Sequence, residues 1–430
     1  MIVTMLASGT RGDTQPYIAL GIELKKRGME VRIAASESYR GLVESYGFDY
    51  APIRGDVAKI IESGVVKEAD NPFKFFSSLK NDDLMDLMVG AQEDQHKACE
   101  GSDAIVYHPG SILGYFVAKE MGIPCILASP FPMVPTNEYP AIIFYDKVRL
   151  GKLSNKLTHL IFEKGFWKMA NSGFKRYWIE KNGELPKGFT NPYPKQRTKN
   201  HPTIVSLSPS VFPIPKDWPE NVHSFGYWFI EDQSGYQPSE ELQQFLDAGD
   251  APIYVGFGSV GDKKRAEEST DMVLKALNET GKRAIINAGS GMEERQNTKE
   301  AFFVKSVPHE WLFPYMSAVV HHGGAGTTAA ALRSGVPQVI IPFGNDQFAW
   351  GRRMNELGVG AKAVPRKELT EEKLSDAIRF TQTAAVQEKA KQLGMKVKSE
   401  RGAQKAAELI VETLKNYHPS QKEMLNHAKS

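Results

Sequence analysis

The chain has 430 residues, with 53 Lys and Arg against 51 Asp and Glu, a formal net charge of +2 at pH 7 and 41% hydrophobic residues. This length exceeds what one hydrophobic core usually serves, so we expect two domains. The composition excludes a disordered or membrane-dominated chain, and the near-neutral charge gives no case for a nucleic-acid partner. Two cysteines are too few for a disulfide framework or a four-ligand zinc site, which predicts a reducing, cytoplasmic location.

The first half of the chain alternates short β-branched runs with helix-length segments that end at glycine. This pattern is typical of a parallel sheet covered by helices. The residues before Gly9 lack the basic start and long apolar run of a secretory signal, so they predict a strand. A helix is expected from about Pro16 to Gly28. Residues 131–178 are rich in aromatic side chains and predict helices that line something apolar. Strands are expected at residues 2–7, 31–35, 104–107 and 125–128.

A polar segment broken by glycine and proline, residues 229–252, predicts an interdomain linker. We therefore expect an α/β protein of two Rossmann-like, doubly wound domains that face each other across a cleft. No apolar run approaches the roughly 18 residues that span a bilayer, so membrane contact would be peripheral. The second series of strands is expected at residues 253–257, 284–288, 303–307, 318–321 and 338–342. The predicted division is a first domain at 1–228, the linker, a second domain at 253–395 and a C-terminal helix at 396–430 that crosses back to the first domain.

The segment 319–328, VVHHGGAGTT, has the pattern of a strand that runs into a glycine-rich turn and then a helix. Glycines let the backbone approach a phosphate, and the free N–H groups of the new helix favour an anion. Thr327 and Thr328 would add hydroxyl donors in the first turn. The alternative is a tight strand-to-helix turn with buried histidines.

A second polar pair, Asp346 and Gln347, comes just after the last strand of the second series. A carboxylate beside a carboxamide offers both acceptors and donors, which suits the hydroxyl groups of a sugar. The alternative is a helix cap formed by Asn345 or Asp346.

Asp13 lies in the loop that follows the first strand, just before the first predicted helix. If its carboxylate faces the cleft, it is a candidate general base for an acceptor hydroxyl. The alternative is that it caps the helix, and its position in the sequence does not decide between the two.

The loop 256–261, GFGSVG, matches a dinucleotide-binding fingerprint, but the next predicted strand does not end in the acidic residue that such a site needs. We interpret it as a loop that faces a phosphate, with Ser259 as a donor. The sequence has no Asp-x-Asp pair for a metal that bridges phosphates. Scattered histidines such as His108, His159 and His309 are predicted to be structural or solvated, and no metal site is expected.

Three of these segments together resemble the donor-binding signature of family 1 nucleotide-sugar glycosyltransferases of GT-B fold. The segments are 307–309, 321–328 and 342–347. The opening SGTRGDTQPY is similar to the sterol glucosyltransferases and to bacterial glycopeptide and macrolide enzymes, and the resemblance extends through 107–109, 129–133 and 351–353. It implies inverting, metal-independent transfer of a hexose, glucose from UDP-glucose, to a hydroxyl of a lipophilic acceptor such as a sterol or triterpenoid. Because the sequence starts at the first strand, it resembles a stand-alone form.

The resemblance also implies roles for individual residues. Asp13 would be the base and His322 would meet the charge of the leaving diphosphate, with no cofactor beyond the nucleotide sugar. The remaining donor-binding residues would be Ser259, Val307, His309, Gly324, Gly326, Thr327, Thr328, Asp346 and Gln347. The acceptor would meet Thr10, Phe131, Met133 and Tyr139 in the first domain.

Other functions stay open at this point. The chain could be an antibiotic, macrolide or flavonoid glycosyltransferase that uses a UDP- or dTDP-sugar. It could also be an NAD(P)-dependent oxidoreductase built on the 256–261 loop, or a nucleotide-sugar binder without activity. The segment 71–80 could be a flap over the acceptor or a surface that touches a membrane.

Overall fold

The structure is a computed structural model that describes residues 1–55, 82–147, 151–231, 235–256, 263–287, 295–344 and 346–417. The chain divides into two compact units. Unit 1 consists of residues 1–141, 148–230 and 400–430, and unit 2 consists of residues 142–147 and 231–399.

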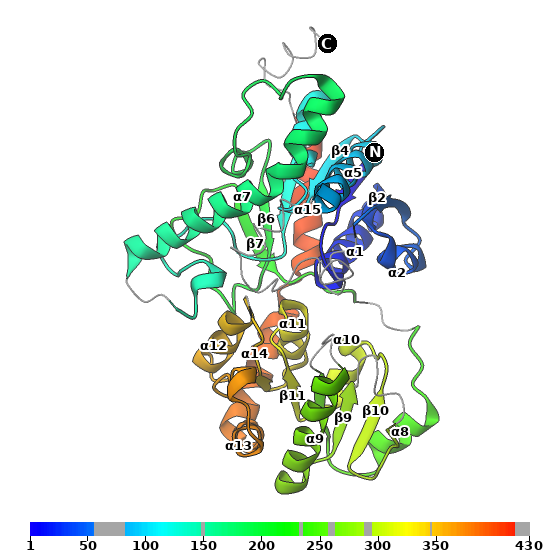
Figure 1. The fold of residues 1–430 in the computed structure, drawn as a ribbon, viewed down its shortest axis with the longest axis vertical. Helices are drawn as coiled ribbons and strands as arrows, with labels where there is room; N and C mark the ends of the chain where they lie inside the picture. The colour runs from blue at the N-terminus through cyan, green and yellow to red at the C-terminus, as the bar shows by residue number, and fades with distance from the viewer. Residues whose placement is uncertain are drawn as a thin grey trace. The chain divides into compact units, whose positions relative to one another are not determined.

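Unit 1 is built on a parallel seven-stranded sheet with the strand order β3-β2-β1-β4-β5-β6-β7 (Figure 1). Helices cover both faces of this sheet, as a parallel sheet requires. Its elements are β1 Ile2–Leu6, α1 Arg11–Lys26, β2 Glu30–Ser36, α2 Arg40–Ser45, β3 Asp49–Ile53, α5 Asp82–Ala98, β4 Ala104–Tyr107, α6 Leu113–Met121, β5 Cys125–Ser129, α7 Lys152–Asn182, β6 Thr203–Ser206, β7 Val222–Gly226 and α15 Gly402–Lys415.

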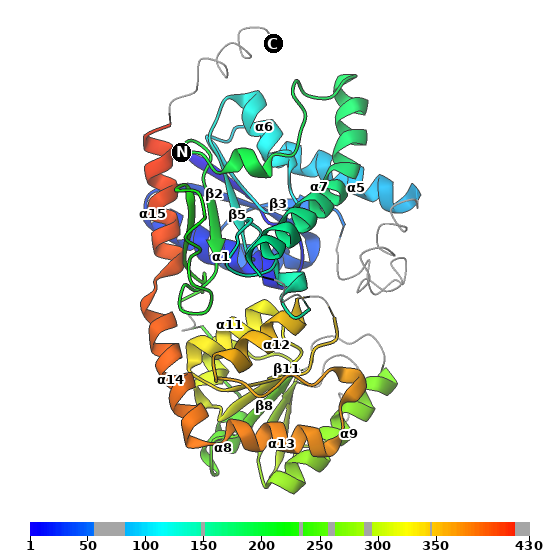
Figure 2. The same cartoon turned by 90° about the vertical axis from the view of Figure 1, so that its left-hand side faces the viewer.

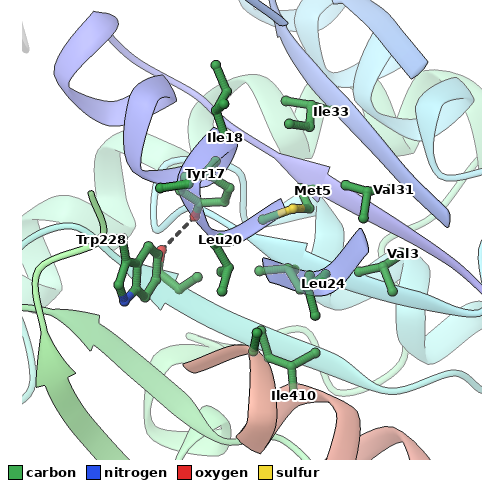
Figure 3. Packing of buried hydrophobic residues seen from close by; sticks show 14 of the residues in the cluster. Val3, Met5, Tyr17, Ile18, Leu20, Leu24, Val31, Ile33, Trp228 and Ile410 are labelled. Carbon is green, nitrogen blue, oxygen red and sulfur yellow. Dashed lines mark hydrogen bonds between the residues drawn. The ribbon is translucent and has the colours of Figure 1, made fainter. Parts of the chain in front are cut away.

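The alternation of side chains along β1 divides the core of unit 1 into two layers. Val3 and Met5 point to the face that α1 and α15 cover, whereas Leu6 points to the face that α5, α6 and α7 cover. Figure 3 shows the first layer, in which Leu24 of α1 and Ile410 of α15 pack beside the strand residues. The C-terminal helix α15 is therefore part of the core of unit 1.

Unit 2 has a parallel five-stranded sheet in the order β10-β9-β8-β11-β12. Helix α9 and helix α13 lie together on one side of unit 2 (Figure 2). Its elements are α8 Glu240–Asp247, β8 Ile253–Gly256, α9 Lys263–Thr280, β9 Ala284–Asn287, β10 Ala301–Val304, α10 His309–Leu312, β11 Ala318–His321, α11 Ala325–Ser334, β12 Gln338–Ile340, α12 Gln347–Glu356, α13 Glu371–Thr381 and α14 Ala384–Ser399.

Several boundaries differ from the sequence-based expectation, and three of these differences have a clear location in the fold. Helix α1 begins at Arg11, because Thr10 and Asp13 form a capping box one turn before Pro16. Residues 229–252 are not an extended linker throughout, since α8 buries Leu242 and Phe245 in unit 2. Strand β10 occupies 301–304 rather than 303–307.

A short segment of the first half of the chain, residues 142–147, belongs to unit 2. The hydroxyl of Tyr145 donates to Glu356 Oε2 of α12 at 2.6 Å. The guanidinium of Arg352, also on α12, donates to the Tyr145 carbonyl and lies 4.8 Å from its ring centroid. These contacts with α12 account for the place of the segment in unit 2.

The strand order of each sheet identifies where a ligand site is expected. In unit 1 the order reverses between β1 and β4, and in unit 2 it reverses between β8 and β11. Loops that leave such neighbouring strands diverge and open a crevice beyond their carboxyl ends. The loop after β1 leads directly into the first turn of α1, which holds Asp13, and the loop after β11 leads through Gly323 and Gly324 into α11.

Candidate functional site

Asp13 stands in the first turn of α1, where its carboxylate caps the helix. Its Oδ2 accepts a hydrogen bond from the Thr10 N–H at 2.7 Å and another from the Thr10 hydroxyl at 3.0 Å. Gly9 has a φ of +132°, and a Cβ there would stand 2.3 Å from the same oxygen. The turn therefore holds the carboxylate tightly by one oxygen, and both alternatives from the sequence, cap and candidate base, remain compatible with its position.

The other carboxylate oxygen of Asp13 faces His108, which directly follows β4. His108 Nδ1 accepts a hydrogen bond from the Gly110 N–H at 3.0 Å, so the proton of a neutral ring sits on Nε2. That Nε2 lies 3.6 Å from Asp13 Oδ1. The prediction that His108 is structural or solvated missed this pairing, because it depends on β1 and β4 being neighbours in the sheet.

The surroundings of Asp13 favour its ionised form. Burial by itself raises the pKa of the carboxyl, but the His108 ring and the two groups of Thr10 outweigh it, and the pKa lies below the ordinary value. The side chain is still 24% exposed. Asp13 is thus an ionised, partly accessible carboxylate at neutral pH.

Aromatic side chains surround His108 on the side of the predicted acceptor residues. The Phe131 ring meets the His108 ring edge to face at 6.0 Å, and it also contacts Phe162 and Phe166 of α7. Asp13 and Phe131 therefore lie on either side of a shared neighbour, His108, and Thr10 is bonded to Asp13, which is the mixture of polar and apolar groups that a site for an apolar alcohol needs.

The other two predicted acceptor residues are placed differently. Met133 is fully buried in the core layer beneath α6 and α7. The Tyr139 ring packs against His159 and Phe212. The structure thus groups Tyr139 with α7 and the segment after β6, apart from the neighbours that Phe131 has around His108.

In unit 2, the glycine-rich loop makes an uncovered helix start. Gly323 adopts a φ of +93°, and Gly324 is the cap residue of α11, so no cap side chain can occupy the first N–H groups. A Cβ on Gly324 would stand 2.6 Å from His322 Nε2, whereas one on Gly326 would meet open space. Thr328 is buried and its hydroxyl donates to the Gly324 carbonyl at 2.9 Å, while Thr327 is partly exposed. Free N–H groups at a helix start suit an anion such as a phosphate.

The two histidines of this loop have different surroundings. His321 is fully buried; its Nδ1 accepts from the Gly323 N–H at 3.1 Å and its Nε2 donates to Gln338 Oε1 at 2.9 Å. Burial lowers its pKa to about 3, so this ring stays neutral and holds the turn. His322 is only partly buried, and its Nδ1 has no hydrogen-bond partner among the described residues. Burial lowers the pKa of His322 as well, so a neutral imidazole with a spare nitrogen lies beside the helix start.

Asp346 and Gln347 both stand at the start of α12, and each is partly used by the fold. Asp346 Oδ2 accepts from the Trp350 indole N–H at 3.0 Å. Gln347 Oε1 accepts from the Phe343 N–H at 2.7 Å and the Gly344 N–H at 3.2 Å. Gln347 therefore retains its amide N–H₂ as a donor for a ligand, and Asp346 places a carboxylate beside it at the same helix start.

The remaining predicted donor residues are also in unit 2. His309 opens α10, where its ring stacks on Phe313 at 4.4 Å and its Nε2 lies 3.2 Å from the Tyr254 hydroxyl. Val307 precedes it and is partly buried. Ser259 and most of the 256–261 loop lie outside the described residues, as does the segment 71–80. Within the described ranges, no three His, Cys, Asp or Glu side chains form a group that could hold a metal ion.

Comparison with known proteins gives matches along nearly the whole chain. Residues 3–95 match the glycosyltransferase family 28 N-terminal domain, and residues 272–414 match the C-terminal domain of erythromycin biosynthesis protein CIII-like proteins. Sterol 3-beta-glucosyltransferase of Pichia angusta is 35% identical over 95% of this chain, and that of Saccharomyces cerevisiae is 34% identical over 95%. The chain spans 33% and 35% of the length of these two relatives.

Solved structures show the same fold. The glycotransferase of kitacinnamycin superposes with a TM-score of 0.69 over 96% of this chain and 99% of its own, at 19% identity. Glycosyltransferase VinC, in complex with DTDP, superposes with a TM-score of 0.68 over 97% of this chain and 100% of its own, at 17% identity. These matches confirm the predicted resemblance to nucleotide-sugar glycosyltransferases and the predicted GT-B fold of two α/β sheets.

Proposed function

We propose that this chain is a glycosyltransferase that moves a hexose, glucose from UDP-glucose, to a hydroxyl group of a lipophilic acceptor such as a sterol, with inversion and without a metal ion. The observation that carries the proposal is the complementary chemistry of the two loops at the sheet switch points. In unit 1 the first turn of α1, just after the loop that follows β1, holds an ionised carboxylate beside His108, whose ring packs against Phe131. The loop of unit 2 presents an uncovered helix start beside a spare imidazole nitrogen. The similarity to the sterol 3-beta-glucosyltransferases supports glucose and a sterol in particular.

In the proposed reaction, Asp13 takes the proton of the acceptor hydroxyl while that oxygen bonds to the anomeric carbon. The bond from the anomeric carbon to the diphosphate oxygen breaks, and its electron pair leaves with UDP. His108 Nε2 lies 3.6 Å from Asp13 Oδ1, beyond hydrogen-bond distance, and in the proposed reaction its N–H attracts the carboxylate and keeps it oriented. The first N–H groups of α11 and the His322 ring meet the negative charge on the diphosphate, a preorganised stabilisation that does not need a metal. The Gln347 amide and Asp346 hold sugar hydroxyls.

A second candidate is transfer from a dTDP-sugar to an antibiotic-type acceptor. The match of residues 272–414 to the erythromycin-type domain and the likeness to VinC in complex with DTDP favour it. The two candidates share the general base and the phosphate loop, and they differ only in the nucleotide, the sugar and the acceptor.

The test is transfer by the purified chain from UDP-glucose or dTDP-glucose, in EDTA, to a panel of sterols, triterpenoids, flavonoids and macrolides, with mass spectrometry of each product. We expect a mass gain of one hexose on a sterol or triterpenoid with UDP-glucose. A gain on a macrolide with dTDP-glucose alone would select the second candidate. Loss of all transfer in EDTA that Mg²⁺ restores would overturn the metal-independent mechanism.

The matched variant is Asp13→Asn, which keeps the size of the side chain and one acceptor oxygen for the Thr10 cap. We expect transfer to fall by about 10²- to 10⁴-fold, as for the loss of a general base, while the affinity for UDP changes by less than about twofold. Near-normal transfer by this variant would exclude Asp13 as the base. A comparable loss of UDP affinity would show that the substitution disturbs more than proton transfer.

A further inference from the structure

The first half of helix α7 exposes aliphatic side chains that a surface helix would normally bury. The exposed fractions are 87% for Leu153, 55% for Leu157, 47% for Leu160 and 53% for Ile161. At 100° per residue, these four positions fall within an arc of about 100° and form one stripe along the helix. We call this stripe, Leu153, Leu157, Leu160 and Ile161, the outer face of α7. Figure 1 shows α7 as a long helix of unit 1.

The opposite side of the same helix turns is buried and polar. The Asn155 amide donates to the Asn137 carbonyl at 3.0 Å, and the Thr158 hydroxyl accepts from the Ala141 N–H at 2.9 Å. His159 Nε2 donates to the Tyr139 carbonyl at 3.0 Å, and burial lowers the pKa of this histidine to about 4, so the ring is neutral. These bonds hold the segment 137–141.

Residues 153–161 of the helix therefore have an inverted polarity, with hydrogen-bonded polar side chains buried and aliphatic side chains exposed. Each of the three buried polar side chains makes a hydrogen bond to the segment 137–141, so the inversion is not a packing fault. Four clustered aliphatic side chains in water carry an unfavourable free energy unless something apolar covers them. The outer face of α7 thus points to an apolar partner.

The charges around the outer face indicate which partner it is. Lys152, Lys156 and Lys164 are exposed on the same half of the helix. Between Lys152 and Ile179 the helix has a single acidic residue, Glu163, which is buried and paired with Arg197. By the same 100° rule, Lys164 lies within the arc of the stripe, Lys156 lies just outside it and Lys152 lies farther round the helix. An aliphatic face with lysines on and beside it is typical of binding in the plane of an anionic membrane surface. A second copy of the chain would bring two sets of these lysines together, which disfavours self-association.

We propose that the outer face of α7 binds the surface of an anionic lipid membrane, with the aliphatic side chains among the acyl chains and the lysines at the phosphates. None of the helices that the structure describes is long and apolar enough to cross a membrane, so this contact is peripheral. The inference goes beyond the proposed reaction and does not depend on it, because binding to lipid needs neither sugar donor nor acceptor.

The test is co-sedimentation of the full chain with vesicles of equimolar phosphatidylglycerol and phosphatidylcholine, and with vesicles of phosphatidylcholine alone. We expect binding to the anionic vesicles that weakens with salt. The double variant Leu157→Glu/Ile161→Glu is expected to bind at least about tenfold more weakly, because both side chains leave the acyl region.

Replacement of Lys152, Lys156 and Lys164 by Gln is expected to reduce binding to the anionic vesicles by about 100-fold at low salt. The control is Met395→Glu, at a side chain that is 57% exposed on α14, which is expected to bind as the unchanged chain does.

Results of three kinds would overturn the proposal. One is equal binding of the unchanged chain to the two kinds of vesicle, or binding that the Leu157 and Ile161 variant retains. Another is a dimer of the unchanged chain in sedimentation velocity that this variant converts to a monomer, because the outer face would then be a self-interface. The third is a variant that binds vesicles normally and loses transfer to a detergent-solubilised acceptor, which would assign the face to the acceptor. An unchanged circular dichroism spectrum and an unchanged thermal unfolding midpoint of each variant verify that it is folded.

Discussion

The two carboxylate oxygens of Asp13 have different neighbours, one in the helix cap and one beside His108. Oδ2 accepts both hydrogen bonds of the Thr10 cap of α1, whereas Oδ1 lies 3.6 Å from His108 Nε2, on a side chain that is 24% exposed. His108 is itself fixed, because the Gly110 N–H occupies its Nδ1. A carboxylate fixed in this way keeps one oxygen available in a constant direction, which is what proton abstraction from a bound hydroxyl requires.

The pH dependence of transfer should report on this pair. The pKa of Asp13 is lowered in the folded protein, so this carboxyl stays ionised to a lower pH than an ordinary aspartate. If ionised Asp13 is the base, kcat/KM should fall on the acid side with a midpoint below the ordinary aspartate pKa of about 3.9. In His108→Phe the effect of burial, which raises the pKa, is no longer offset by the imidazole. We expect the acid limb to move upward and the rate at neutral pH to fall by about 10- to 100-fold, because the carboxylate also loses its orientation. The measurement is kcat/KM against pH.

The conservative variant separates positioning from packing. In His108→Gln, the amide nitrogen can occupy the place of Nε2 and donate to Asp13, so we expect the acid limb and most of the rate to return toward those of the unchanged chain. If both variants keep the original acid limb, or if both lose the rate equally, His108 does not act through Asp13.

At the scale of the elements, the glycine-rich loop depends on how closely its backbone approaches the His322 ring. A Cβ on Gly324 would stand 2.6 Å from His322 Nε2, and the φ of −61° at Gly324 is one that alanine adopts freely. Gly324→Ala should therefore displace the ring while leaving the fold intact. Since His322 is proposed to meet the diphosphate, we expect both Gly324→Ala and His322→Ala to weaken UDP binding by about tenfold or more.

The double variant gives the decisive comparison. With the ring absent, the methyl group that Gly324→Ala adds has nothing to displace, so this substitution should cost little further affinity in the His322→Ala background. Titration calorimetry with UDP measures all four proteins of this cycle. Additive losses would indicate that Gly324 acts through its backbone alone.

The sequence predicted the strands that border the site better than the strands at the sheet edges. The strands β4 and β11 have the expected bounds, 104–107 and 318–321, and β1 and β8 each end one residue earlier than expected. Strand β3 was not predicted; it contains Pro52, which the ladder tolerates because β3 is an edge strand. Strands β6 and β7, which are four and five residues long, were also not predicted.

The sequence predicted where the loops of the site lie, but it did not predict which side chains from different parts of the chain meet there. Asp13 and the glycine-rich turn are visible as local patterns, whereas the partner of Asp13, His108, lies 95 positions away and meets it only through the strand order. The aromatic segment was expected to line something apolar, and several of its rings, Phe174 and Trp178 among them, pack in the core of unit 1 instead. Several aliphatic side chains of α7 are exposed instead. A sequence pattern cannot show which side of a helix faces inward when polar and apolar residues occur on both sides.

At the scale of the whole molecule, the chain passes from unit 1 to unit 2 and returns. The return occurs between α14 and α15, where Arg401 adopts a φ of +56°, a conformation that L-residues other than glycine rarely take. The next residue, Gly402, lies against the backbone of β7, and a Cβ there would stand 2.4 Å from the Gly226 carbonyl oxygen. From this point α15 packs on α1 and completes the core of unit 1 (Figure 3).

Adjacent substitutions at this turn should have opposite effects. Gly402→Ala places a methyl group against main-chain atoms that cannot move aside, so we expect a loss of about 1–3 kcal/mol in the stability of unit 1. Arg401→Gly relieves an unfavourable dihedral angle but adds freedom to the unfolded chain, so the stability should stay equal or rise by up to about 1 kcal/mol.

Hydrogen exchange measured by mass spectrometry shows in which of the two units the Gly402→Ala substitution has its effect. In Gly402→Ala, peptides from α1 should lose protection because α15 covers them, while peptides from α11 in unit 2 should keep theirs. Equal loss in both would mean that the two units unfold as one cooperative body, and no loss in either would mean that α15 adjusts its position without cost.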